Sequence, residues 1–210
     1  IVFWSMPIVF LFIVLRAQIV RVILGSGSFS WSDTRLVAAS LALFSLSIVA
    51  QSINLLIVRA YYAAGKTRKP LSINFIFSLS IVAFAFAFIA LFKHVDGIRY
   101  FFESLLRVED VEETVALMLP LAYSVGTLLN AFALWRTFKR DFSDEPLPLA
   151  RTLLQSLGAS LVLGAVAYGG LMLFDDIFNI DTFSGILFQG LCAGLLGLTA
   201  WAIILRLLNN

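Results

Sequence analysis

The sequence is poor in the residues from which catalytic and metal centres are usually built. It contains a single histidine, His94, and a single cysteine, Cys192, among 210 residues. One cysteine forms neither an internal disulfide nor a cysteine cluster around a metal. Because His94 stands beside Lys93 at the end of an apolar run, we predict neither a multi-histidine metal site nor a Ser–His–Asp triad. We therefore expect no catalytic residue, no bound metal and no enzyme activity.

Charged residues are scarce as well. They make up 13% of the chain, whereas a soluble domain carries about 25%, and hydrophobic residues make up 60%. Such a chain cannot cover its own core with polar surface. The net charge of +2 is spread over several bends instead of forming one basic stripe, so nucleic acid is not an expected partner. Membrane lipids are the surroundings that this composition indicates.

Long apolar runs occupy most of the chain, and each can cross a hydrocarbon layer as a helix of about 20 residues. The chain lacks the alternating segments of roughly ten residues that are typical of a membrane barrel. We therefore predict an all-α integral membrane protein with six transmembrane helices. The apolar runs cover residues 1–24, 36–62, 71–93, 114–135, 150–174 and 184–208.

The bends between these runs alternate in charge. Basic bends carry Arg59, Lys66, Arg68, Lys69, Arg136, Lys139 and Arg140, and acidic bends carry Glu109, Asp110, Glu112, Glu113, Asp175 and Asp176. By the positive-inside rule, the basic bends are cytoplasmic and the acidic ones external, which places the C-terminal Asn210 in the cytoplasm. The first residues are already apolar and no Met precedes them, so we expect the chain to lack its N-terminal part.

The stretch RAYYAAGKTRKP, residues 59–70, gathers four cations at one bend, namely Arg59, Lys66, Arg68 and Lys69. One interpretation is that these charges only fix the membrane orientation and contact anionic lipids. The other is that they attract an anionic substrate at a cavity mouth, because an arginine can hold phosphate oxygens through two parallel hydrogen bonds. The residues alone leave both interpretations open.

Two pairs of polar residues lie inside predicted spans, where polar side chains are costly and usually face protein or water. Gln51 and Asn54 are three residues apart, as are Thr127 and Asn130, so each pair shares a helix face. They either form hydrogen bonds between helices or line a water-filled path. Since no catalytic set accompanies them, transport is favoured over enzyme activity.

Glycines recur in the last two spans, including Gly164, Gly169, Gly190 and Gly194. Small residues usually mark close contact between membrane helices. A smooth face of this kind could also form a shallow groove for a lipid chain, and the sequence does not decide between the two.

Three segments carry a resemblance to a known family: AQIVRVILGSGSFSWSDT at 17–34, RAYYAAGKTRKPLSI at 59–73 and LAYSVGTLLNAFALW at 121–135. Their order and content resemble the MurJ/MviN lipid II flippases of the multidrug/oligosaccharidyl-lipid/polysaccharide exporter superfamily. The matching residues are Ile19, Val20, Arg21, Gly27, Phe29, Asp33 and Thr34, then Arg59, Tyr62, Ala63, Thr67 and Pro70, and finally Gly126, Thr127 and Asn130.

The resemblance implies that these six spans are numbers nine to fourteen of a fourteen-helix, two-lobed transporter whose N-terminal half is missing here. Residues 1–140 would supply four second-lobe helices, and residues 141–210 a C-terminal helix pair with a groove for the lipid tail. The implied activity is flipping of undecaprenyl-pyrophosphate-linked peptidoglycan precursor across the bacterial cytoplasmic membrane by alternating access, as a monomer.

The arginines that the family uses most directly for the pyrophosphate lie outside this chain, and we base hypotheses for the residues noted above on where they cluster. Arg59, Lys66, Arg68 and Lys69 would contact or gate the head group, and Gln51, Asn54, Thr127 and Asn130 would line the cavity. Gly164, Gly169, Gly190 and Gly194 would line the lipid-tail groove.

No cofactor is implied, and coupling to sodium or to the membrane potential is left open. Thr127 stands at a ligand position, whereas residues 81–88 lack the Asn that many relatives carry in this span. The alternatives are a related exporter of polysaccharide-lipid or small molecules, and a non-transporting membrane scaffold.

Overall fold

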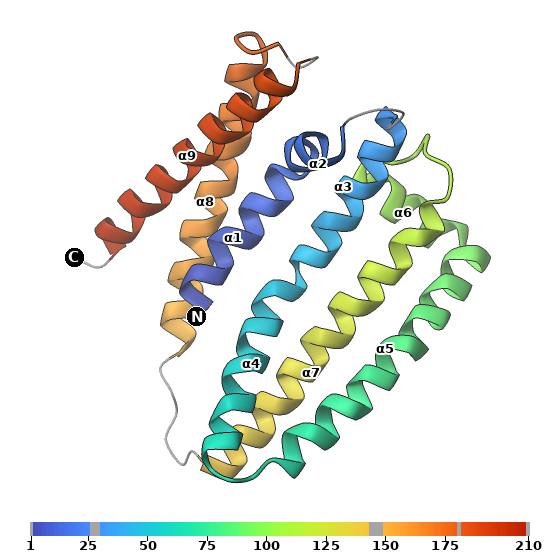
Figure 1. Ribbon diagram of the computed structural model, residues 1–210, viewed down its shortest axis with the longest axis vertical. Coiled ribbons are helices and arrows are strands. Elements are labelled where there is room, and N and C mark those ends of the chain that lie inside the picture. The colour runs from blue at the N-terminus through green and yellow to red at the C-terminus, as the bar shows by residue number, and fades with distance from the viewer. Residues whose placement is uncertain (1, 26–29, 143–148, 180–181, 209–210) are drawn as a thin grey trace. The chain divides into compact units, whose positions relative to one another are not determined.

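The computed structural model describes residues 2–25, 30–142, 149–179 and 182–208, and all regular structure within them is helical (Figure 1). Gly27, Phe29 and Asn210, which figured in the sequence-based predictions, lie outside these ranges. The elements are α1 (Val2–Val14), α2 (Arg16–Leu24), α3 (Trp31–Ser45), α4 (Ser47–Ala63), α5 (Arg68–His94), α6 (Asp96–Leu106), the 3-10 helix η1 (Thr114–Leu117), α7 (Met118–Phe142), α8 (Leu149–Asp175) and α9 (Phe183–Leu208).

Five helical stretches are long and apolar enough to cross a membrane. They coincide with the last five predicted runs, so the predicted all-α membrane fold is confirmed. The stretches are Trp31–Ala63, which joins α3 and α4, then Arg68–His94, Thr114–Phe142, Leu154–Asp175 and Phe183–Leu207.

The first predicted span is not one straight helix. α1 and α2 meet at Leu15 with a bend of 71°, and the protein has six spans if this pair crosses the membrane as one broken span. α2 carries Arg16, Gln18 and Arg21 within nine residues, and charged side chains are costly in hydrocarbon. The Arg21 guanidinium lies 4.5 Å from the centre of the Trp31 ring, an arrangement in which the ring attracts the cation.

The helices form two compact units. Unit 1 comprises Leu43–Leu147, and unit 2 comprises Val2–Ala42 with Pro148–Asn210, so α3 contributes to both. α1 and α2 therefore group with α8 and α9. The sequence analysis divided the chain differently, into second-lobe helices at residues 1–140 and a C-terminal helix pair at residues 141–210. That division concerns the lobes of a larger transporter, and it stays a prediction.

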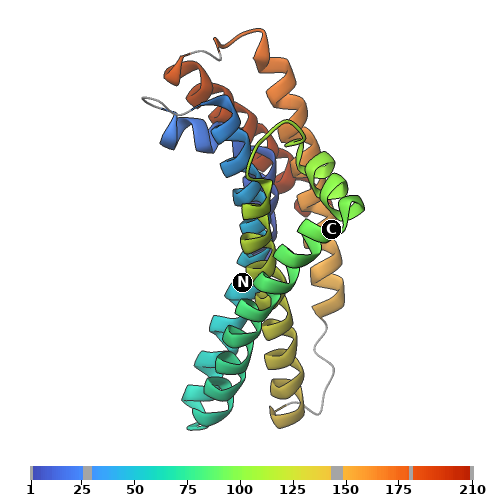
Figure 2. The same cartoon turned by 90° about the vertical axis from the view of Figure 1, so that its right-hand side faces the viewer.

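In unit 1, α7 packs against α4 on one side and α5 on the other, as Figures 1 and 2 show from two directions. Ile57, Tyr61 and Leu134 form a buried cluster near the end of the unit that holds the basic bend. Nearer the start of α7, the buried Ser124 hydroxyl donates a hydrogen bond of 2.6 Å to the Leu43 carbonyl. This bond ties α7 to the end of α3.

In unit 2, α8 packs against α9, while α1 lies on α8 and α2 lies on α9. A cluster of Ala159, Leu163, Trp201 and Leu205 forms its core. At the other end of the helix pair, the buried Gln189 amide donates to the Leu171 carbonyl (3.2 Å) and to the Asp175 carboxylate (3.3 Å). Small residues let α8 and α9 approach closely.

Gly126 on α7 lies directly against the Ile81 side chain of α5. A Cβ placed on Gly126 would collide with the Ile81 side chain. Gly126→Ala should therefore force α5 away from α7, and overpacking of this kind typically costs about 1–3 kcal/mol. We expect a lower midpoint of thermal unfolding in detergent, measured by tryptophan fluorescence.

Gly169→Ala is the matched control, because a Cβ on this helical glycine meets no atom within 4 Å. Its unfolding midpoint should equal that of the wild type or exceed it. Equal losses in the two variants would show that Ile81 does not limit the approach.

Candidate transport site

Unit 1 contains an open cavity of about 590 Å³ that is bordered by α4, α5 and α7, and most of the residues that line it are polar. The polar lining residues are Gln51, Ser52, Asn54, Asn74, Ser78, Tyr123, Thr127 and Asn130. The four residues that the sequence singled out, Gln51, Asn54, Thr127 and Asn130, are thus brought together in one cavity. Because all three helices belong to candidate spans, the cavity lies in a part of the protein otherwise suited to hydrocarbon.

The lining residues are only partly satisfied by one another. The Asn130 amide donates to the Asn74 side-chain oxygen at 3.0 Å, which links α7 to α5. The side-chain oxygens of Asn54 and Asn130 are buried and accept no hydrogen bond within the described residues. Buried acceptors of this kind favour a donor. The cavity itself can exchange hydrogen bonds with water or with a polar substrate through the polar residues that line it.

Asn74 and Ser78 were missed by the sequence reasoning. That reasoning looked at the middle of the span, residues 81–88, whereas these two residues lie nearer the start of α5. They are four residues apart in the first half of this helix, and this spacing puts both on one face. The same rule that selected the other polar pairs would have found them.

An apolar groove of about 450 Å³ adjoins the polar cavity. The two share Ile81 and Tyr123. The groove residues on α5 lie toward α6, and the polar residues lie toward the basic bend. Its lining is Phe44, Ile81, Val82, Ala85, Phe86, Ile89, Leu119 and Tyr123. Unit 1 thus offers a polar surface and an apolar surface in succession.

The basic bend between α4 and α5 is tied to the end of α7. Lys69 forms an ion pair of 2.6 Å with Asp141, and the buried Tyr61 hydroxyl donates to the same carboxylate oxygen at 3.0 Å. The Lys66 ammonium lies 4.7 Å from the centre of the Phe142 ring. Lys66 and Lys69 therefore connect the bend and the start of α5 to the end of α7, and Tyr61 connects the end of α4 to it. Asp141, the acidic partner, was not among the predicted residues.

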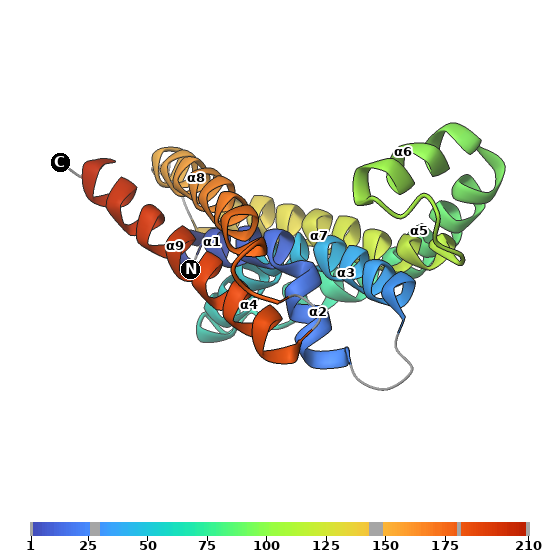
Figure 3. The same ribbon diagram turned by 90° about the horizontal axis from the view of Figure 1, so that it is seen from above.

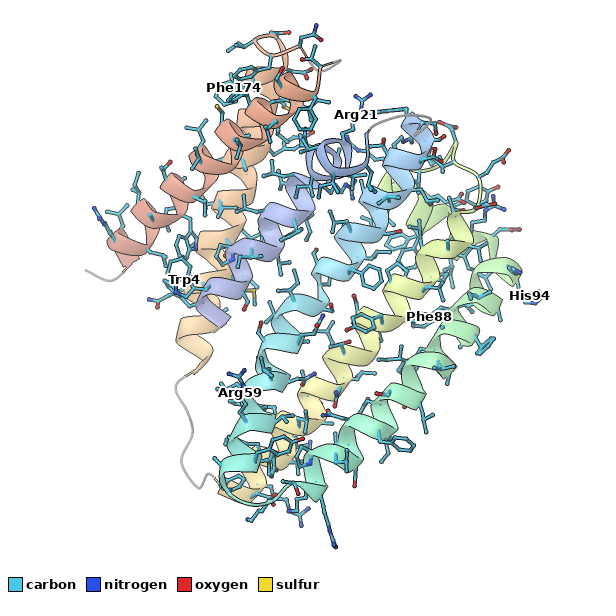
Figure 4. All side chains as sticks on the ribbon, in the orientation of Figure 1. Trp4, Arg21, Arg59, Phe88, His94 and Phe174 are labelled. Carbon is cyan, nitrogen blue, oxygen red and sulfur yellow. The ribbon has the colours of Figure 1, made fainter. Side chains whose placement is uncertain are left out.

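Arg59 and Arg68, the two arginines of the cluster, differ from the lysines. Both are exposed, and neither side chain forms a hydrogen bond or ion pair within the described residues. Figure 4 shows the Arg59 side chain on the side of α4 that faces away from α7. The structure thus separates the four predicted cations into two that bridge helices and two that are available to an anion.

Three of the four predicted groove glycines lie at close helix contacts in unit 2. A Cβ on Gly164 would meet Phe10 at 3.2 Å, one on Gly190 would meet Gln18 at 3.3 Å, and one on Gly194 would meet Leu15 at 3.2 Å. Gly169, by contrast, has open space beside it. Gly190 also lines a small apolar groove of about 240 Å³ between α2 and α9. A role for these glycines in holding a lipid tail stays a prediction.

The candidate spans are the arrangement of a multi-pass membrane protein, and three of them border a cavity lined mainly by polar residues. Within the described residues, no group of three or more His, Cys, Asp or Glu side chains is placed to hold a metal ion. The family model described as "Lipid II flippase MurJ" matches residues 1–188. The chain therefore belongs to the MurJ family of lipid II flippases, transporters that serve peptidoglycan biosynthesis, and the predicted family and function are confirmed. No curated protein and no solved structure matches the chain.

The Asn74–Asn130 bond makes the cavity testable. Asn74→Leu removes the acceptor of the Asn130 amide, and hydrogen bonds between membrane helices contribute about 1 kcal/mol. We expect a measurable drop in the midpoint of thermal unfolding. Ser80→Ala on the same helix is the control, because the Ser80 hydroxyl bonds only to the Ile76 carbonyl of its own helix. A drop of the same size in Ser80→Ala would contradict the assignment.

Proposed function

We propose that the protein moves lipid II across the bacterial cytoplasmic membrane by alternating access, and that the polar cavity of unit 1 forms part of the head group's path. The observation that carries this proposal is an open cavity that is lined mainly by polar residues and bordered by three candidate spans, in a chain of the lipid II flippase family. The polar head group has to pass about 30 Å of hydrocarbon, where unsatisfied polar groups are costly.

The cavity has the chemistry that this passage needs. The exposed oxygens and amides of a peptidoglycan precursor form hydrogen bonds, and the polar residues that line the cavity offer both donors and acceptors. The prenyl chain can stay in an apolar environment. The groove beside Gly190 is our candidate for its contact with the protein. Sodium or the membrane potential would supply the direction of transport.

The orientation is part of the proposal. The basic bend carrying Lys66 lies at one end of unit 1 and the acidic segment carrying Glu112 follows α6 at the other, as Figure 1 shows. The positive-inside rule places the first in the cytoplasm, together with the C-terminus. The six spans then act as numbers nine to fourteen of a fourteen-span monomer, completed by the N-terminal half of the same polypeptide.

We further propose that Arg59 and Arg68 attract the pyrophosphate at the cytoplasmic entrance. Both are exposed and unpaired within the described residues, and an arginine can hold two phosphate oxygens at once. Lys66 and Lys69 gate the entrance by fixing the bend against Asp141 and Phe142.

Cysteine labelling tests orientation and alternation in one experiment. Lys66→Cys, Glu112→Cys and Gln51→Cys are made separately in full-length protein carrying Cys192→Ala, and a membrane-impermeant maleimide is added to one side at a time. We expect Lys66→Cys to react from the cytoplasm, Glu112→Cys from outside, and the cavity-lining Gln51→Cys from either side. Reaction of positions 66 and 112 from the same side would overturn the orientation. Reaction of position 51 from only one side would count against alternation at this cavity.

Arg59→Ala and Lys69→Ala distinguish a residue that attracts the substrate from one that stabilises the fold. Removing Arg59 should slow lipid II flipping per folded molecule by about tenfold, the loss expected for one charge-assisted hydrogen bond, and leave the unfolding midpoint unchanged. Removing Lys69 should lower the midpoint, because Asp141 loses its ion pair. If a correctly inserted Arg59→Ala variant flipped lipid II at the wild-type rate, the proposed role of Arg59 in attracting the head group would be wrong. Arg59→Lys, which keeps the charge but not the paired donors, should fall in between.

A further inference from the structure

α6 leaves three large apolar side chains exposed and buries one carboxylate, which is unusual for a helix on a water-facing surface. Tyr100, Phe101 and Leu105 are 68%, 61% and 60% exposed, whereas Glu103 is 3% exposed. α6 follows the membrane span α5 after a single residue. The exposed apolar side chains therefore point to an apolar medium at that end of unit 1.

The orientation of α6 is held by a buried polar contact. The Thr114 hydroxyl donates to the Glu103 carboxylate at 2.6 Å, and Arg99 donates to the same oxygen at 2.9 Å. A buried carboxylate is costly unless it is paired and hydrogen-bonded, so turning Glu103 toward lipid or leaving it without these donors is unfavourable. Thr114 begins η1, which leads directly into α7, and the contact therefore fixes α6 to the start of a membrane span.

The segment after α6 reinforces this placement. Arg107 ends the helix in a left-handed conformation (φ 59°), and the following Val108 and Val111 are buried. The chain thus has apolar residues that it buries in protein beside α6, yet it leaves Phe101 and Leu105 on the outside. The exposed face is a built feature of the fold and not a loosely attached loop.

The exposed face of α6 continues an apolar surface of α5. Leu91 near the end of α5 and Val95 at the junction are 43% and 40% exposed, and Tyr100 and Phe101 follow. Figure 3, which looks along the bundle from above, shows α6 turned across the end of α5. Tyrosine and other aromatic side chains are favoured at the boundary between hydrocarbon and head groups.

We propose that α6 lies in the bilayer interface, with Tyr100, Phe101 and Leu105 inserted among the lipids of the leaflet at the end of unit 1 opposite the basic bend. An amphipathic helix in this position buries its apolar face at the level where head groups meet acyl chains. Glu103 acts as a positioning residue that turns this face outward. The acidic residues Glu109 and Asp110 that follow are exposed and extend into water.

Spin labels on single cysteines test the proposal in full-length protein carrying Cys192→Ala, reconstituted in vesicles of phosphatidylethanolamine and phosphatidylglycerol. Labels are placed at Phe101→Cys and Leu105→Cys, with Asp110→Cys as the aqueous control. Oxygen partitions into lipid and a nickel chelate into water, so the ratio of their collision rates reports depth. We expect the ratio at positions 101 and 105 to be several-fold above that at 110.

Two outcomes would overturn the placement of α6 in the bilayer interface. A ratio at positions 101 and 105 equal to that at 110 would place the face in water. Labels shielded from both oxygen and nickel would place the face against another protein surface instead of lipid.

Thr114→Val and Thr114→Ser test the positioning role of Glu103. Valine has nearly the shape of threonine but cannot donate to the carboxylate, whereas serine can. The collision ratio at position 105 should fall toward the value at 110 in Thr114→Val and stay unchanged in Thr114→Ser. An unchanged ratio in both variants would remove Glu103 from the proposal, while the labels in the unmutated background would still decide whether the face meets lipid.

Discussion

Hydrocarbon offers no hydrogen-bond partner, and this constraint shapes nearly every feature of the protein. Backbone groups are satisfied within helices, so the described chain is built from long rods. Polar side chains in those rods must find partners in neighbouring helices or in a cavity. Ser124 finds the Leu43 carbonyl, and Asn130 finds Asn74. The side-chain oxygens of Asn54 and Asn130 accept no hydrogen bond within the described residues, and both residues line the open cavity that three helices border.

The charges at the ends of unit 1 differ in the contacts that they make. Lys69 meets Asp141, and Glu103 meets Arg99 and Thr114, so these charges hold helix ends in place at both ends of unit 1. Arg59 and Arg68 have no such partner within the described residues. A count of basic residues treats all four cations of the bend alike. The structure separates them, because the two lysines contact α7 and the two arginines do not.

Much of this arrangement could be predicted from the sequence, because hydropathy depends on local composition. Five apolar runs became five candidate spans, and the three-residue spacing of Gln51 with Asn54 and of Thr127 with Asn130 placed them on faces that meet. The remainder depends on contacts between distant segments. The ion pair of Lys69 joins residues 72 positions apart in the chain, and no local sequence pattern predicts that Asp141 is its partner. The bend at Leu15 was missed because Arg16 and Gln18 were counted within an apolar run instead of as the start of a separate helix.

The Asp141 carboxylate uses a single oxygen, Oδ2, to accept from both Tyr61 and Lys69. Two interactions that share an atom are not energetically independent. The contribution of Tyr61 therefore depends on whether Lys69 is present, and neither can be assigned a free energy of its own. The three helices α4, α5 and α7 consequently come together at this end of unit 1 as one cooperative contact.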